Sequence, residues 1–298
     1  MRLRLMIEGQ EDVTWPQWLA LAGACEEHDV DGLFRSDHYR GWTRRPGGAL
    51  DAWTTLAGLA AVTRRIRLGT LVSPVTFRPA AVLAKSAVTV DHISGGRVEV
   101  GIGMGWNERE HAIHGFPFPP TRDRARMLGE QVETIVSHWT DDDEVQPKPV
   151  QRPHPPLIVG GGAKPGTLGP AVRHANEYNT FGIPPDEFRA RRRRLDEACE
   201  AAGRDPASIR CTLMTTFVAG DDRPTLEENL RRVLSLVGRD GDDVPSSWIV
   251  GTTEEAADRL REYADAGCDG AYLQHLVHED LETVELIGRR LAPLVADV

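Results

Sequence analysis

The chain has little of what defines several classes of protein. Its 298 residues include only four cysteines (Cys25, Cys199, Cys211 and Cys268), which are widely spaced and form no C-x-x-C motif. A disulfide framework is therefore not expected, and reduced thiols are the plain interpretation. Long apolar runs are also missing, and the N-terminal stretch MRLRLMI is too short for a signal peptide or a membrane helix. We expect a cytoplasmic protein that does not bind membranes.

Positive charge is scarce as well. Three lysines accompany 32 arginines, and the net charge is −10. Proteins bind nucleic acids largely through Lys and Arg contacts to phosphates, so an acidic chain is a poor candidate for that function. The apolar share of 40% and the charged share of 27% are typical of a soluble globular enzyme. A small molecule is the expected partner.

What the sequence does contain is a regular alternation of short apolar runs and helical patterns. Such alternation indicates parallel strands joined by right-handed crossovers. Eight units in a chain of this length favour a closed (β/α)8 barrel, a TIM barrel, over an open doubly wound sheet. We predict one domain over residues 1–298, with an irregular insertion after the fourth strand at residues 104–120. The expected strands are residues 2–7, 32–36, 66–72, 97–103, 155–162, 177–181, 209–219 and 269–275.

Polar and glycine residues follow the expected strands. The second strand ends with Ser36-Asp37-His38, the fifth with Gly160-Gly161-Gly162, and the eighth with Gln274-His275. Active sites of these barrels lie at the carboxyl ends of the strands. The sequence therefore predicts that these residues share one site at the mouth of the barrel.

Three stretches resemble a known family. They are SDHYRGW (residues 36–42), the segment from IRLGTLV to HGFPFP (residues 66–119) and PKPVQRPHPPLIVGGGAKPGTL (residues 147–168). Together they resemble the luciferase-like monooxygenase superfamily, and most of all its branch that uses coenzyme F420 (8-hydroxy-5-deazaflavin). The resemblance implies a hydride-transferring oxidoreductase, with the tricyclic ring of the cofactor in the mouth of the barrel.

The resemblance also implies site residues. His38, Trp42 and a glutamate near the end of the first strand, either Glu11 or Glu8, match catalytic positions of deazaflavin-dependent dehydrogenases, and we assign Glu11 to this role. Those relatives carry a further glutamate where this chain has Trp106, which argues against a sugar phosphate as substrate. The expected cofactor-binding residues are Asp37, His38, Thr70, Leu71, Val72, Gly103, Gly105, Trp106, Gly160, Gly161, Gly162, Ala163, Lys164 and Asn179. Leu71-Val72 corresponds to a bulge that often contains a non-proline cis peptide.

Each motif also has a plainer interpretation. The glycine turn is neither a P-loop nor a G-x-G-x-x-G motif and eases tight turns by itself. His111 and His114 are expected to be loop histidines, because no HExxH motif accompanies them. The arginine run RARRRR (residues 189–194) is expected to be a solvated helix face.

Three other functions stay open on the sequence alone. One is an FMN-dependent monooxygenase on the same scaffold. The second is a metal-dependent hydrolase built from Asp37, His38 and a further histidine such as His275, although no metal site is predicted. The third is a cofactor-binding protein without turnover. A homodimer is expected from the resemblance.

Overall fold

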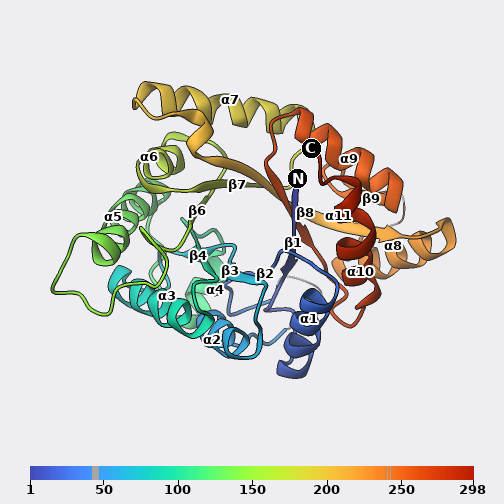
Figure 1. The fold of residues 1–298 in the computed structure, drawn as a ribbon, viewed down its shortest axis with the longest axis horizontal. Helices are drawn as coiled ribbons and strands as arrows, with labels where there is room; N and C mark the ends of the chain where they lie inside the picture. The colour runs from blue at the N-terminus through green and yellow to red at the C-terminus, as the bar shows by residue number, and fades with distance from the viewer. Residues whose placement is uncertain (42–46, 240, 242) are drawn as a thin grey trace.

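The computed structural model describes residues 1–41, 47–239, 241 and 243–298, and it has a closed parallel barrel at its centre (Figure 1). The strands of the barrel pair in the order β1-β2-β3-β5-β6-β7-β8-β10, and β10 returns to β1, which closes the ring. The predicted (β/α)8 barrel is confirmed. The barrel strands are β1 (Arg2–Ile7), β2 (Gly32–Arg35), β3 (Arg67–Thr70), β5 (Val98–Gly103), β6 (Leu157–Gly160), β7 (Glu177–Phe181), β8 (Arg210–Gly220) and β10 (Gly270–Gln274).

Helices surround the barrel (Figure 1). Several begin at the residues that the sequence suggests: Thr14 caps the first helix, and Asp51 caps the second by accepting a hydrogen bond from the backbone N–H of Thr54. The helices are α1 (Trp15–Glu27), α2 (Ala52–Val62), α3 (Ala80–Ser94), α4 (Glu108–His114), α5 (Thr121–Thr140), α6 (Pro165–His174), α7 (Pro185–Ala201), α8 (Arg223–Val237), α9 (Thr253–Asp265), α10 (Glu282–Glu285) and α11 (Ala292–Leu294), with a 3-10 turn at Pro206–Ser208 and a π-helical segment at Leu286–Leu291.

Three elements differ from the expectation. The third strand ends at Thr70, and a two-residue strand, β4 (Ser73–Pro74), then pairs with β5. The segment 104–120, expected to be irregular, contains helix α4. An additional strand, β9 (Ile249–Thr252), pairs with the second half of β8, beyond the part of β8 that belongs to the barrel. The eight strands of the barrel itself are the eight expected.

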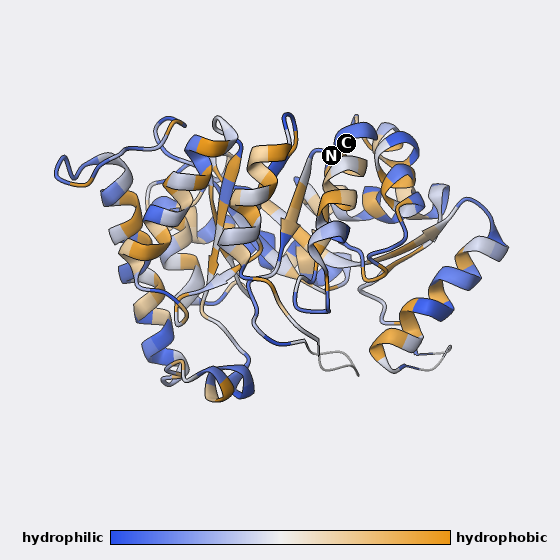
Figure 2. Cartoon of the chain, turned by 90° about the horizontal axis from the view of Figure 1, so that it is seen from below, coloured by the Kyte–Doolittle hydropathy of each residue, from blue (hydrophilic) through white to orange (hydrophobic). Residues whose placement is uncertain are grey.

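The packing follows the usual layering of such barrels. The strands are almost entirely buried, and the helices present apolar faces to them, so that hydrophobic residues gather inside and hydrophilic ones on the outer faces (Figure 2). Leu5, Leu33, Val100, Val159 and Leu273 are among the strand residues buried in the main core. None of the described helices is both long and apolar enough to cross a lipid bilayer.

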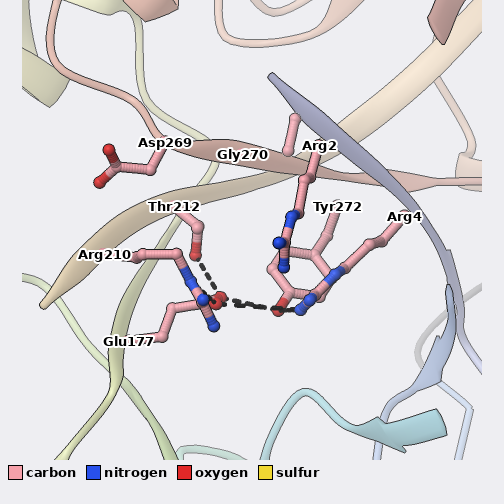
Figure 3. A pocket seen from close by; sticks show the side chains of 9 residues that line it. Arg2, Arg4, Glu177, Arg210, Thr212, Asp269, Gly270 and Tyr272 are labelled. Atoms are coloured by element: carbon pink, nitrogen blue, oxygen red, sulfur yellow. Dashed lines mark hydrogen bonds and ion pairs between the residues drawn. The ribbon is translucent and has the colours of Figure 1, made fainter. Parts of the chain in front are cut away.

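The amino end of the barrel is closed by a buried ionic network (Figure 3). The guanidinium group of Arg4 donates two hydrogen bonds to Glu99, at 2.8 and 3.0 Å, and one to the Tyr272 hydroxyl at 2.6 Å. The Tyr272 hydroxyl in turn donates to Glu177 at 2.7 Å, and Arg210 approaches the same carboxylate. The crevice among these residues is about 10 Å³, so this end of the barrel is closed and the opposite end carries the site.

Candidate active site

A cavity of about 660 Å³ opens at the carboxyl ends of the barrel strands. This volume lies within the range of small-molecule and cofactor sites. Most of the residues predicted to bind cofactor line it: His38, Leu71, Val72, Gly103, Gly105, Trp106, Gly160, Gly161, Gly162 and Asn179. Segments from opposite sides of the barrel therefore meet in one place, as the positions of the strand ends predict.

The floor of the cavity is formed by Leu71 and Val72. The peptide bond between them is cis, as the resemblance implies. The Val72 side chain fits against the backbone of the neighbouring strands, because a Cβ atom at Gly103 would lie 2.6 Å from Val72 Cγ2 and one at Gly160 would lie 3.1 Å from Val72 Cγ1. Glycine at these positions makes room for the side chain of Val72, so the floor can remain closely packed beneath a ligand.

His38 lines the cavity, and Glu110, which does not line it, contacts the imidazole of His38. Its Nδ1 lies 2.7 Å from Oε2 of Glu110, a fully buried carboxylate on α4. The other oxygen of Glu110 accepts the backbone N–H groups of Tyr39 at 2.5 Å and Arg40 at 3.1 Å. Glu110 thus joins α4 to the segment that carries His38.

The charge of Glu110 governs the protonation of His38. Burial alone would lower the pKa of His38, but the hydrogen bond and charge of Glu110 outweigh it and raise this pKa above the ordinary histidine value. Burial would likewise raise the pKa of Glu110, but the contact with His38 and the two backbone donors hold it below its ordinary value. Both shifts favour the charged forms of the two groups, which lie 2.7 Å apart beside the cavity.

Asp37 has a different role from the one expected. Its carboxylate accepts hydrogen bonds from Arg78 at 2.5 Å and from the Ser73 hydroxyl at 2.6 Å, and it is not among the residues that line the cavity. Arg78 also donates to Asp51 at 2.6 Å. These hydrogen bonds fix the backbone of the segment that follows β2, and the adjacent residue His38 is positioned by that segment.

Of the two candidate glutamates after β1, Glu8 lines the cavity and Glu11 does not. Glu8 is buried and accepts side-chain hydrogen bonds from Gln10 at 2.7 Å and from Gln274 at 2.5 Å. Glu11 lies in the turn beyond, where its carboxylate approaches Gly41. Trp42, the other residue assigned a catalytic role, lies outside the described residues.

The glycine turn after β6 faces an arginine that the sequence did not single out. Arg191, on α7, lines the cavity, and a Cβ atom at Gly162 would lie 3.7 Å from its Nη1. Its guanidinium group bonds to Thr180 at 2.5 Å and Glu187 at 2.6 Å, while its buried Nε has no hydrogen-bond partner. A guanidinium group that lines the cavity next to a glycine turn suits an anionic part of a ligand.

Three further residues predicted to bind cofactor do not line the cavity. The Thr70 hydroxyl donates to the carbonyl of Gly101 at 2.9 Å, which ties β3 to β5. The backbone N–H of Ala163 donates to the Tyr178 hydroxyl at 2.7 Å. Lys164 is exposed at the start of α6. Thr70 therefore stabilises β3, and Ala163 and Lys164 belong to the turn between β6 and α6. Residues adjacent to them in the chain, such as Leu71 and Gly162, line the cavity.

Two aromatic side chains lie at the mouth. Trp106 is 65% exposed and Phe181 is 58% exposed, although both line the cavity. The Trp106 ring packs edge-on against His38, with 5.8 Å between the ring centroids. Large exposed aromatics at the rim of a pocket are suited to cover a bound ligand.

The histidines give no support to a metal centre. His275 bonds to the carbonyl of Asp280 at 2.9 Å, and Asp37 is engaged by Arg78. His111 and His114 belong to α4 and not to a loop, and both pack against aromatic rings. Across the residues that the structure describes, no group of three or more His, Cys, Asp or Glu side chains is placed to hold a metal ion.

Comparison with known proteins adds to this geometry. A model of the luciferase-like monooxygenase family matches residues 3–270. An uncharacterized protein of Mycobacterium tuberculosis is 39% identical over 171 residues, which is 52% of this chain and 58% of that protein, so the match spans under two thirds of the relative. An F420-dependent glucose-6-phosphate dehydrogenase of Kineococcus radiotolerans is 31% identical over 280 residues, covering 82% of each chain.

Solved structures show the same fold. The coenzyme F420-dependent tetrahydromethanopterin reductase of Methanopyrus kandleri superposes with a TM-score of 0.80 at 20% identity, over 98% of this chain and 99% of that one. The oxygenating constituent of 3,6-diketocamphane monooxygenase from Pseudomonas putida, solved with FMN, gives a TM-score of 0.78 at 15% identity, over 98% of both chains. One fold therefore serves proteins that bind different cofactors.

Proposed function

The chain belongs to the luciferase-like monooxygenase family, and on that premise we propose that it is an oxidoreductase that uses the deazaflavin coenzyme F420 to transfer a hydride to or from a small organic substrate. The observation that carries the proposal is the single cavity that joins an apolar floor, a histidine–glutamate pair and a glycine turn facing Arg191. The F420-dependent dehydrogenase of Kineococcus radiotolerans, similar over most of the chain, supports this cofactor.

The residues of the cavity fit such a cofactor. Leu71 and Val72 offer an apolar surface for a planar ring, and the glycines of the turn let a ligand approach the backbone. The guanidinium group of Arg191, which lines the cavity beside Gly162, gives the anionic tail of the cofactor a charged donor. His38 lies at the polar side, where a proton would be needed.

When bound, the coenzyme supplies the hydride chemistry. The residues of this chain do the rest: the floor excludes water from one side, Arg191 binds negative charge, and His38 exchanges a proton with the substrate. Trp106 stands at the mouth beside His38 and presents an apolar surface. Because no carboxylate occupies that position, we propose that the substrate is not a sugar phosphate.

FMN is the second candidate, supported by the FMN-bound structure of the same fold. An enzyme of that kind would retain FMN through purification, or would consume oxygen in the presence of reduced flavin. Either result would replace the deazaflavin in the proposal and leave the location of the site unchanged.

A binding titration tests the cofactor. We expect coenzyme F420 to bind more tightly than FMN, as followed by fluorescence quenching. Arg191→Gln should weaken F420 binding by about tenfold or more, because a charge-assisted contact is lost, and should affect the tail-free deazaflavin chromophore less. Arg193→Gln, on the exposed face of the same helix, is the matched control. Tighter binding of FMN, or equal loss in the two arginine variants, would contradict the proposal.

A further inference from the structure

Glu110 is placed to act on the cavity without lining it. Its carboxylate is fully buried, and its two oxygens accept three donors: His38 Nδ1 and the backbone N–H groups of Tyr39 and Arg40. Asn107 caps the start of α4 and accepts the backbone N–H of Glu110 at 3.2 Å. The carboxylate is thus held on both sides, by its own helix and by the segment after β2.

We propose that Glu110 is a positioning residue that fixes His38 with Nε2 toward the cavity and keeps that nitrogen protonated, so that His38 serves as the proton donor in a reduction. An ionised carboxylate can only accept hydrogen bonds, so His38 Nδ1 must carry a proton toward Glu110. Nε2 is then the ring nitrogen that a ligand in the cavity can reach.

The surroundings of His38 explain why the second proton is retained. Three carboxylates face it: Glu110 from α4, Glu8 from the end of β1 and Asp37 from its own segment. The charge of Asp37 is largely balanced by its ion pair with Arg78. Glu8 accepts hydrogen bonds from the side-chain amides of Gln10 and Gln274, which carry no charge. Glu110 is therefore the partner that decides the charge of His38, and its contact raises the pKa of the imidazole in spite of burial.

The proton held on Nε2 completes a reduction. A substrate double bond would gain a hydride at one atom, from the reduced deazaflavin, and a proton from Nε2 at the other. His38 becomes a neutral imidazole and takes a proton from water to return to its starting state. This inference rests on the proposed function for the hydride alone, because the state of His38 can be measured without any cofactor.

The sign of the pH dependence follows from the raised pKa. The pairing of His38 with Glu110 contributes its full stabilisation between the unfolded-state pKa values of glutamate, about 4.3, and histidine, about 6.5. That contribution is lost as the pH rises through the folded-state pKa of His38, and also at low pH as Glu110 is protonated. Proton donation by His38 declines over the same range. If His38 acted as the proton acceptor instead, activity would rise with pH over the same range.

Nitrogen-15 NMR of the histidine side chains tests the inference on the cofactor-free protein. His38, assigned by the loss of its signals in His38→Asn, should be protonated on both ring nitrogens at pH 7. In Glu110→Gln, burial is no longer opposed by the charge of Glu110, and only the weaker effects of Glu8 and Asp37 remain. The titration midpoint should therefore fall by about one to two pH units, a tenfold to hundredfold loss of proton affinity. Glu108→Gln, exposed on the same helix, should leave the midpoint unchanged.

The possible outcomes are distinct. Glutamine retains an oxygen for Tyr39 and Arg40, so Glu110→Gln should fold, and its melting temperature checks this. A neutral His38 at pH 7 in the unsubstituted protein overturns the inference even if that variant does not fold, and so does an unchanged midpoint in a folded Glu110→Gln. Failure of F420 to bind would instead remove the proposed function and leave the measured state of His38 as it is.

Discussion

Replacing His38 by asparagine should lower turnover by about 10²–10⁴-fold, while the affinity for coenzyme F420 changes little. Asparagine is close to histidine in size and can still donate a hydrogen bond toward Glu110, but it carries no titratable proton. His38 lines the cavity beside Trp106, so the change removes the proposed proton source without opening the floor at Leu71 and Val72. Turnover is followed by the absorbance of F420, with a substrate that the unsubstituted protein accepts.

A second histidine variant tests whether the loss of turnover is specific to His38. His92→Asn changes an exposed histidine on α3 that bonds to the carbonyl of Lys148, away from the cavity. It should keep its turnover. Undiminished turnover in His38→Asn would remove His38 from the mechanism, and a parallel loss of F420 binding would make it a binding residue.

Replacing Arg4 by methionine should destabilise the fold by about 3–5 kcal/mol. The guanidinium group lies between Glu99 and Glu177, which are each almost fully buried. Its removal takes away the cation that they share and leaves each carboxylate with one partly exposed arginine, Arg67 for Glu99 and Arg210 for Glu177. Methionine fills much of the space, so the loss would come from charge and not from a cavity. Chemical denaturation measures the free energy of unfolding.

Arg2→Met is the control for this prediction. Arg2 is exposed at the same end of the barrel, and its replacement should change the free energy of unfolding by about 0.5 kcal/mol or less. Adding Glu99→Gln and Glu177→Gln to Arg4→Met should restore part of the stability, since the two buried carboxylates that lost a cation are then neutral. If Arg4→Met is as stable as Arg2→Met, the ionic network does not hold this end of the barrel.

Most of the fold could be predicted from the sequence because local patterns and global architecture agree. Apolar runs such as residues 2–7 and 177–181 became strands with the expected bounds, and Thr14 and Asp51 capped their helices. The failures were short elements. β9 has only four residues, and it forms a strand because it pairs with β8. No local sequence pattern predicts that pairing.

Site residues at the ends of strands could be predicted from the sequence. Residues that reach the site from helices, through tertiary contacts, were harder to predict. The roles assigned to the residues that line the cavity stay predictions. Glu110 was missed, although Asn107 followed three residues later by a glutamate is a helix-start pattern. Arg191 was placed on a solvated face, although it stands three residues after Phe188 and four before Leu195, both buried. Helical periodicity would have assigned it to the inner face.

Two residues show what a sequence cannot settle. Asp37 and His38 are neighbours in the chain, yet Asp37 turns to Arg78 and Ser73 while His38 turns to the cavity. Arg78, which donates a hydrogen bond to Asp37, lies 41 residues away along the chain. Which member of an adjacent pair faces the ligand depends on such distant partners.

A crystal structure of the protein with coenzyme F420 tests the central claim most directly. We predict that the ring lies against Leu71 and Val72 beside His38, with the anionic tail toward Gly161, Gly162 and Arg191. A ring bound outside this cavity, or a tail directed away from the glycine turn, would contradict the account.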